Sequence, residues 1–171
     1  MIAPLSLSNV LTVLVALLCS WTMSPQARGG VVKTWRLAVP PCFAGVQAMV
    51  LLAGVFDAKW QHDMEWLAGL LLGAAIGHVR GWKLTVAVDQ MRGLILLPRT
   101  NDGRLVALAL VGLAGIDFLS AYLEDPIIEP QHIAALAAMC AGYLGARALS
   151  VVVRSIHSPH VELSPTTPDR A

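Results

Sequence analysis

The residues of this chain whose types suit chemistry are polar side chains inside long apolar stretches. Asp117 lies within the apolar stretch 105–123, and an ionisable group inside a membrane-spanning helix costs several kcal/mol unless it is paired or hydrated. Gln47 and Tyr143 lie at matching depths in two other apolar stretches, and Arg147 follows Tyr143 by about one helical turn. These four side chains would form a relay for a proton or another cation.

The same residues also have a purely structural interpretation. A protonated Asp117 would hold two helices together through a hydrogen bond worth about 1 kcal/mol, and Arg147 would extend its side chain to the lipid headgroups. The sequence shows no continuous polar path that would decide between the two interpretations. They differ in whether Asp117 contacts water or only protein.

Histidines and cysteines form no metal or redox motif. His62 and His132 each begin an expected helix and face the same compartment, which makes them candidate ligands of a haem or a transition metal. No supporting spacing accompanies them, and surface histidines are the simpler interpretation. The cysteines, at positions 19, 42 and 140, stand alone in separate apolar stretches, which is typical of small buried side chains. Because no catalytic motif is present, we expect no enzymatic activity and no bound metal or cofactor.

The elements that must position these residues are membrane-spanning helices. Of the 171 residues, 56% are hydrophobic and 13% are charged, and the mean hydropathy is +0.66. A soluble domain of this size would have to bury more apolar surface than its volume allows. The net charge of +1 excludes a basic nucleic-acid binder. Spans of close to the roughly 20 residues that cross a bilayer are expected at 4–23, 37–56, 64–79, 105–123 and 133–153.

The distribution of basic residues predicts the topology. Lysine and arginine gather in the connections after the first span (Arg28, Lys33, Arg36) and after the third (Arg80, Lys83, Arg92, Arg99, Arg104). Because basic connections stay in the cytoplasm, we expect the N-terminus outside and the C-terminus inside. A four-span alternative, without the short third stretch, would break this alternation. Residues 1–154 would form one transmembrane domain, and the polar, proline-bearing residues 155–171 a disordered cytoplasmic tail.

Glycines at a spacing of four mark the third span as a packing helix. Gly69, Gly73 and Gly77 fall in one row, which forms a groove for the close approach of another helix. A stripe of small residues on the fifth span includes Gly145. Both surfaces predict helix contacts, either within the chain or with a second copy or another membrane protein.

The hydrophobic period changes after the third span. Residues 84–88 alternate and are rich in β-branched side chains, residues 89–93 have turn chemistry with Gly93 at an expected positive φ, and residues 94–97 run back to Pro98. The segment 84–97 is therefore predicted to be a short cytoplasmic β-hairpin. An irregular amphipathic loop is the alternative, because an isolated hairpin is marginally stable.

The central run resembles a group of small, largely uncharacterised bacterial integral membrane proteins. It consists of the glycine row 69, 73 and 77, Arg80, the strand-like residues 84–89, and Arg92-Gly93 leading to Pro98. In that group a glycine-rich helix leads through an arginine into a short strand pair and then a proline. The run is also distantly similar to the CcdC-like membrane proteins associated with cytochrome c biogenesis. The resemblance implies a bacterial inner-membrane protein and carries over no catalytic residue. The absence of paired cysteines gives no support to thiol exchange.

We therefore expect an all-α membrane protein of five transmembrane helices, with a hairpin between the third and fourth. Its expected role is that of a non-enzymatic accessory or packing component of a membrane assembly, with the lipid bilayer and a second copy or other membrane proteins as partners. The alternative is a small proton- or cation-linked transporter that uses Asp117.

Overall fold

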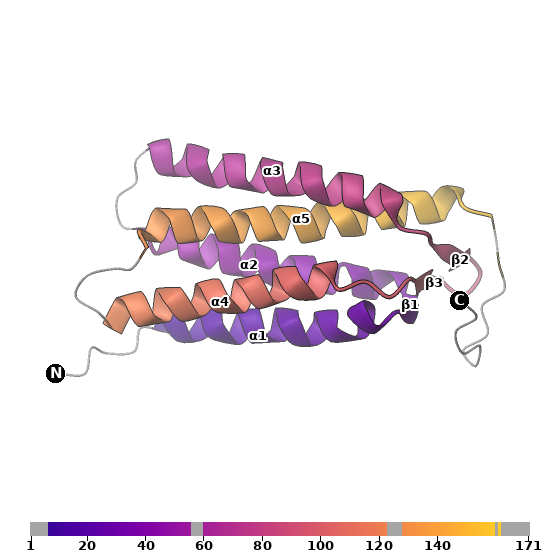
Figure 1. Ribbon diagram of the computed structural model, residues 1–171, viewed down its shortest axis with the longest axis horizontal. Coiled ribbons are helices and arrows are strands. Elements are labelled where there is room, and N and C mark those ends of the chain that lie inside the picture. Colours follow the sequence, from indigo (N-terminus) through magenta and orange to yellow (C-terminus); the bar gives the residue numbers. More distant parts are fainter. Residues whose placement is uncertain (1–6, 56–59, 123–127, 160, 162–171) are drawn as a thin grey trace.

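The computed structural model describes residues 7–55, 60–122, 128–159 and 161, and these residues form helices with one small sheet (Figure 1). The α-helices within these ranges are α1 (Leu7–Arg28), α2 (Val39–Ala53), α3 (Trp60–Lys83), α4 (Asp102–Tyr122) and α5 (Pro130–His157). A short 3-10 helix, η1 (Thr34–Leu37), precedes α2. The strands are β1 (Gly30–Lys33), β2 (Ala87–Asp89) and β3 (Leu94–Leu97).

The helices lie side by side along one long axis, and successive helices run in opposite directions (Figure 1). The strands consequently gather at one end of the bundle, which we call the sheet end. Helix α1 begins at the opposite end, and α5 finishes at the sheet end. Helix α5 packs against α2, α3 and α4, whereas α3 packs mainly against α5 and lies at the edge of the bundle.

Within the described residues, four segments are long and apolar enough to cross a membrane: Leu7–Arg28, Thr34–Ala53, Asp102–Ala121 and Pro130–His157. The expected membrane-protein class is confirmed at this level. Helix α3 is not among the four, although it is 24 residues long and lies alongside them, because acidic and basic residues near both of its ends dilute its apolar centre.

Several helices extend beyond the bounds expected from hydrophobicity. Helix α1 passes through Pro25 and ends at Arg28, where a basic side chain suits the negative end of the helix dipole. Helix α5 begins at Pro130, a residue preorganised for the first helical turn. It also continues to His157, so the expected tail beginning at residue 155 is helical in its first residues. Most of that tail, residues 160 and 162–171, lies outside the described residues.

The glycine row of α3 packs directly against the backbone of α5. A Cβ atom at Gly69, Gly73 or Gly77 would overlap the carbonyl oxygen of Ala135, Met139 or Tyr143, respectively. From the other side, a Cβ atom at Gly142 would overlap the carbonyl oxygen of Leu70 and lie 3.0 Å from the Ala74 nitrogen. We call these four glycines the glycine seam. The sequence left open whether the glycine row contacts a helix of this chain or of another protein. The row contacts α5 of the same chain.

Gly145 does not take part in the glycine seam. No atom of another described residue lies within 4 Å of the position that a Cβ would occupy there. Gly142 is the glycine of α5 that contacts α3. Within the described residues no helix packs closely at Gly145, and its expected role in contacts with another protein stays a prediction.

The predicted hairpin is present, and the described residues build it into a sheet in the order β1-β3-β2. Gly93 adopts a φ of +60° in the turn, as its place there requires. The hairpin gains a third, antiparallel strand from the connection between α1 and α2, with Gly30 opposite Leu97. The sheet packs on the end of α5 through a buried apolar cluster: Val32, Leu37, Leu84, Val88, Ile95, Leu97 and Val151.

Candidate functional site

A cluster of polar side chains lies where α3, α4 and α5 approach the sheet. Arg147 and Tyr143 belong to α5, Arg80 lies in the last turn of α3, Asp102 begins α4, and Thr100 comes just before it. We call these five residues the sheet-end cluster. They come from three segments that are far apart in the sequence, and the packing of α3 and α4 on α5 brings them together.

Arg147 is the most unusual member of the sheet-end cluster. It is only 8% exposed, and its Nη2 atom donates a hydrogen bond to the Thr100 hydroxyl over 3.0 Å. Its Nε atom is buried and has no acceptor. Among the described residues, no carboxylate forms an ion pair with its guanidinium. A buried positive charge with incomplete hydrogen bonding destabilises a fold, so its presence calls for a reason.

The space around Arg147 depends on a glycine in the first turn of α4. A Cβ atom at Gly103 would lie 2.9 Å from the Arg147 Nη1 atom and would overlap the terminal methyl of Met23. Gly103 therefore admits two long side chains, one from α1 and one from α5, to the same spot. The guanidinium is held over the start of α4 by this packing and by Thr100.

Arg80 and Asp102 form an ion pair beside Arg147. Both side chains are partly exposed, so water screens the pair and its contribution to stability is small. Asp102 also suits the first turn of α4, where the helix dipole favours a negative charge. The Tyr143 side chain lies within electrostatic reach of Arg80, Asp102 and Arg147. Two arginines and one carboxylate give the sheet-end cluster a net positive charge.

The end of α3 is fastened to α5 by polar contacts beyond the glycine seam. The Ser150 hydroxyl and His78 Nδ1 lie 2.9 Å apart. Arg154 donates from Nη1 to the carbonyl oxygens of Trp82, at 2.8 Å, and Leu84, at 2.6 Å, and so satisfies carbonyl groups left free where the helix ends. The guanidinium of Arg154 also lies 5.8 Å from the centre of the Trp82 ring. These contacts hold α3 in place at the sheet end.

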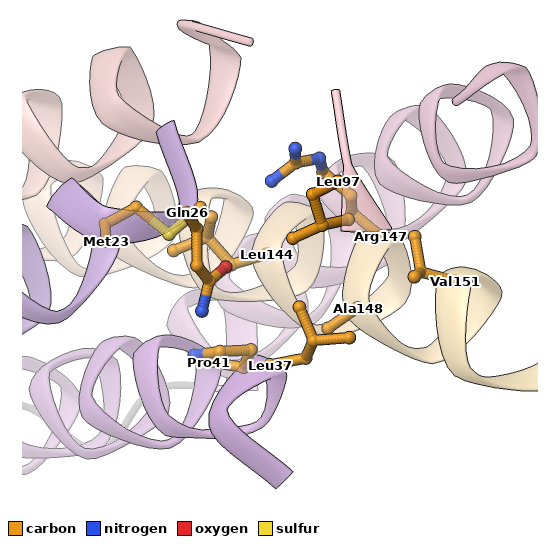
Figure 2. Close-up of a pocket in the computed structure, with 9 residues that line it drawn as sticks. All are labelled: Met23, Gln26, Leu37, Pro41, Leu97, Leu144, Arg147, Ala148 and Val151. Carbon is orange, nitrogen blue, oxygen red and sulfur yellow. The ribbon is translucent and has the colours of Figure 1, made fainter. Parts of the chain in front are cut away.

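The cavity beneath Arg147 is too small for a substrate. Figure 2 shows the residues that line it: Met23, Gln26, Leu37, Pro41, Leu97, Leu144, Arg147, Ala148 and Val151. Its volume is about 10 Å³, which is at the lower limit for a single water molecule. The lining is apolar apart from Gln26 and Arg147, and the Gln26 amide donates to the Arg36 carbonyl over 2.8 Å. The sheet-end cluster is thus a packed polar junction.

The four residues expected to form a relay are not joined. Gln47 is fully buried and donates from Nε2 to the Leu110 carbonyl over 3.0 Å, whereas its Oε1 has no partner. Asp117 lies on α4 about two turns beyond Leu110, away from the sheet end, and is partly buried. Among the described residues it has no hydrogen bond or ion pair. Tyr143 and Arg147 belong instead to the sheet-end cluster, whose charged neighbours are Arg80 and Asp102.

The candidate ligand His132 is placed apart from the sheet-end cluster. His132 lies at the opposite end of the bundle, with Nδ1 3.5 Å from a Glu129 oxygen and Nε2 4.0 Å from a Glu65 oxygen. Within the described ranges, no group of three or more metal-ligating side chains comes together. Cys19 and Cys140 share the central apolar core, and Cys42 is exposed.

Sequence reasoning missed Thr100, Asp102 and Gln26 as partners in this region. A signal was present for Asp102 alone, since an acidic residue directly before an apolar helix is a typical N-terminal feature. The chain has no match among protein-family models, curated proteins or solved structures. The resemblance to CcdC-like proteins therefore stays a prediction.

Proposed function

We propose that this chain is a non-enzymatic, multi-pass protein of the bacterial inner membrane that serves as an accessory component of a membrane assembly. The observation that carries this proposal is the closed interior. The described core is filled by alanine, leucine and isoleucine side chains from four helices, and the cavity at the sheet-end cluster holds at most one water. Such a packed interior in the described residues favours a role that is carried by the surfaces.

The surface that suits a protein partner is the outer side of α3. Leu72, Ile76 and Val79 follow one another at helical spacing and are about half exposed. Helix α3 is less apolar than the four candidate spans, yet the glycine seam fixes it alongside them. We infer that α3 crosses the membrane as a fifth span and that another membrane protein, or a second copy, covers its outer side.

The proposal is tested by changing that outer side without disturbing the glycine seam. The variant Leu72→Trp places a bulky side chain where only lipid or a partner lies, and Leu14→Trp makes the same change on the exposed surface of α1. In a mild detergent extract of its own membrane, we expect the wild type to migrate in a larger assembly, Leu72→Trp to be released from it, and Leu14→Trp to remain. A monomeric wild type would overturn the proposal.

The proposed orientation places the sheet end in the cytoplasm and the start of α1 outside. Basic residues in the connections at this end support it. Met91, in the hairpin turn, is 91% exposed and gives a labelling position. In a variant with the native cysteines replaced by serine, Met91→Cys should react with a membrane-impermeant maleimide only after the cells are opened. Labelling in intact cells would reverse the orientation.

Proton- or cation-linked transport through Asp117 is the second candidate. It is favoured by the Asp117 carboxyl, which is partly buried and has no hydrogen bond or ion pair among the described residues, and by the buried Gln47 Oε1 atom, which has no hydrogen-bond partner there. Its test is proton flux into liposomes that carry the purified protein, with Asp117→Asn as the matched variant. Flux that is present in the wild type and lost in the variant would replace the accessory role by transport.

A further inference from the structure

A groove opens between the ends of α1 and α2 at the sheet end. It has a volume of about 340 Å³, which is within the range of small-molecule sites. Residues of α1, η1 and α2 line it: Trp21, Thr22, Pro25, Trp35, Arg36 and Val39. Trp21 and Trp35 are 74% and 62% exposed, respectively. Tryptophan is enriched at the level of lipid headgroups, so the composition places this groove at the membrane–water boundary.

Buried contacts fix the shape of the groove. Gln26 is 6% exposed and donates from Nε2 to the Arg36 carbonyl over 2.8 Å, which ties η1 to α1. The Ala38 amide donates to the Trp35 carbonyl over 3.1 Å and leads η1 into α2. The Arg36 guanidinium lies 5.7 Å from the centre of the Trp35 ring, within the range of a cation–π interaction. The wall that carries the positive charge is therefore held in place before any ligand arrives.

No acidic residue lies near this groove in the sequence. The first 56 residues contain no aspartate or glutamate, and this part of the chain carries Arg28, Lys33 and Arg36. Among the described residues, Arg36 makes no ion pair with a carboxylate. A guanidinium presents a planar fork of donors that matches the oxygens of a phosphate. Arg36 therefore gives this groove a set of donors that suits a phosphate group.

An apolar stripe leads from the groove along α1. Leu18, Leu17 and Leu14 precede Trp21 by three, four and seven residues, so they lie on the same side of the helix as Trp21. All three are exposed. A ligand with its phosphate at Arg36 would lay a hydrocarbon chain against these leucines. The ligand that combines the two features is a phospholipid.

We propose that the groove of Trp21, Trp35 and Arg36 is a binding site for one anionic phospholipid. The lipid phosphate accepts hydrogen bonds from the Arg36 guanidinium, the glycerol backbone lies between the two indole rings, and an acyl chain follows the leucine stripe of α1. The Thr22 hydroxyl donates to the Leu18 and Cys19 carbonyls and so adds no donor to the site. Arg36 thus carries the preference for anionic over zwitterionic headgroups.

The test counts lipids bound to the purified full-length chain by native mass spectrometry. The delipidated protein is titrated with phosphatidylglycerol and with phosphatidylcholine of the same acyl chains. The wild type should bind the first phosphatidylglycerol on the order of fivefold more tightly than phosphatidylcholine, as expected for one basic residue at a charged headgroup. Arg36→Gln should abolish this ratio, and Trp21→Ala should weaken the binding of both lipids.

The matched control is Arg99→Gln, which removes the same charge from an exposed position at the sheet end but outside the groove. It should leave the lipid preference unchanged. The proposal is overturned if the wild type binds both lipids equally, or if Arg99→Gln lowers the preference as much as Arg36→Gln. Displacement of the bound lipid by inorganic phosphate alone would also overturn it, because the site would then recognise only an anion.

Discussion

Glycines make close contacts in two regions of this molecule, and the contacts differ in kind. At the glycine seam, a Cβ atom at Gly73 would overlap the backbone carbonyl of Met139. At the sheet-end cluster, a Cβ atom at Gly103 would meet the ends of the Met23 and Arg147 side chains. Backbone in a packed helix moves only with the whole helix, whereas long side chains change rotamer. The glycine seam is therefore rigid, and the sheet-end cluster can adapt.

The two regions therefore differ in role: the glycine seam supports the fold, and the sheet-end cluster is the candidate functional region. The glycine seam is apolar and fastens residues 69–77 of α3 to residues 135–143 of α5. The sheet-end cluster contains a buried arginine whose hydrogen bonding is incomplete, which is a cost that packing alone does not require. We therefore expect opposite changes in the free energy of unfolding. A methyl group added at the glycine seam should lower it, and an apolar side chain in place of Arg147 should raise it.

The largest expected effect is that of Gly73→Ala at the glycine seam. One methyl group should force α3 away from α5, and the free energy of unfolding should fall by about 3 kcal/mol, at the upper end of typical overpacking costs. The measurement is chemical or thermal unfolding in detergent, followed by helical circular dichroism. Gly145→Ala is the matched control on α5, because a Cβ there meets no other described residue within 4 Å. Equal stability of the two variants would contradict the seam.

Two elements of the fold could be predicted from local periodicity in the sequence. The four-residue spacing of Gly69, Gly73 and Gly77 indicated a packing row, and the alternation in residues 84–97 indicated the hairpin, because both patterns are complete within one element. The strand β1 was not predicted. Glycine is unfavourable in strands, as at Gly29 and Gly30, and a four-residue strand becomes stable only beside β3, which lies more than sixty residues away.

The candidate site was less predictable than the helices. Arg147 stood out because a charge within an apolar stretch is rare, but its partner Thr100 is a common residue in a loop. Asp117, Gln47 and Tyr143 were grouped by depth along their helices. Depth gives a position along the helix axis and leaves open which way each side chain faces, and that direction is set by tertiary packing. For the same reason, the stripe of small residues on α5 indicated Gly145 and did not indicate Gly142, which is the glycine that contacts α3.

At the sheet-end cluster, Arg147→Met should stabilise the protein. A buried arginine without a carboxylate partner is replaced by an apolar side chain of similar length, so the free energy of unfolding should rise by about 1–2 kcal/mol. The measurement is the same unfolding assay. Thr100→Val supplies the control: it should lower stability in the wild type, where it removes a hydrogen bond, and should have little effect beside Arg147→Met. Destabilisation by Arg147→Met would show that its charge is satisfied in the fold.

A smaller effect is expected for Gly103→Ala. The new methyl group meets movable side-chain ends, so the free energy of unfolding should fall by no more than about 1 kcal/mol. The loss should become smaller in the double variant with Arg147→Met, because a neutral side chain without the Thr100 hydrogen bond can turn away more easily, whereas the overlap with the Met23 methyl remains. A cost as large as that of Gly73→Ala would remove the distinction between a rigid seam and an adaptable cluster.

The smallest expected effect concerns a glycine outside both regions. Gly112 is exposed in the middle of α4, and no atom of another described residue lies within 4 Å of where its Cβ would stand. Gly112→Ala should therefore raise the free energy of unfolding by about 0.5–1 kcal/mol, because alanine loses less backbone entropy than glycine when a helix forms. In the unfolding assay, a rise in the free energy of unfolding agrees with an open surface at Gly112, and a fall contradicts it. If Gly112→Ala were destabilising in detergent, where no lipid or partner is present, the open space at this surface of α4 would have to be filled in the folded protein. A fall in stability that is seen only in membranes would instead indicate that a partner contacts this surface of α4. The surface of α4 would then be an alternative to the outer side of α3 as the site of the partner.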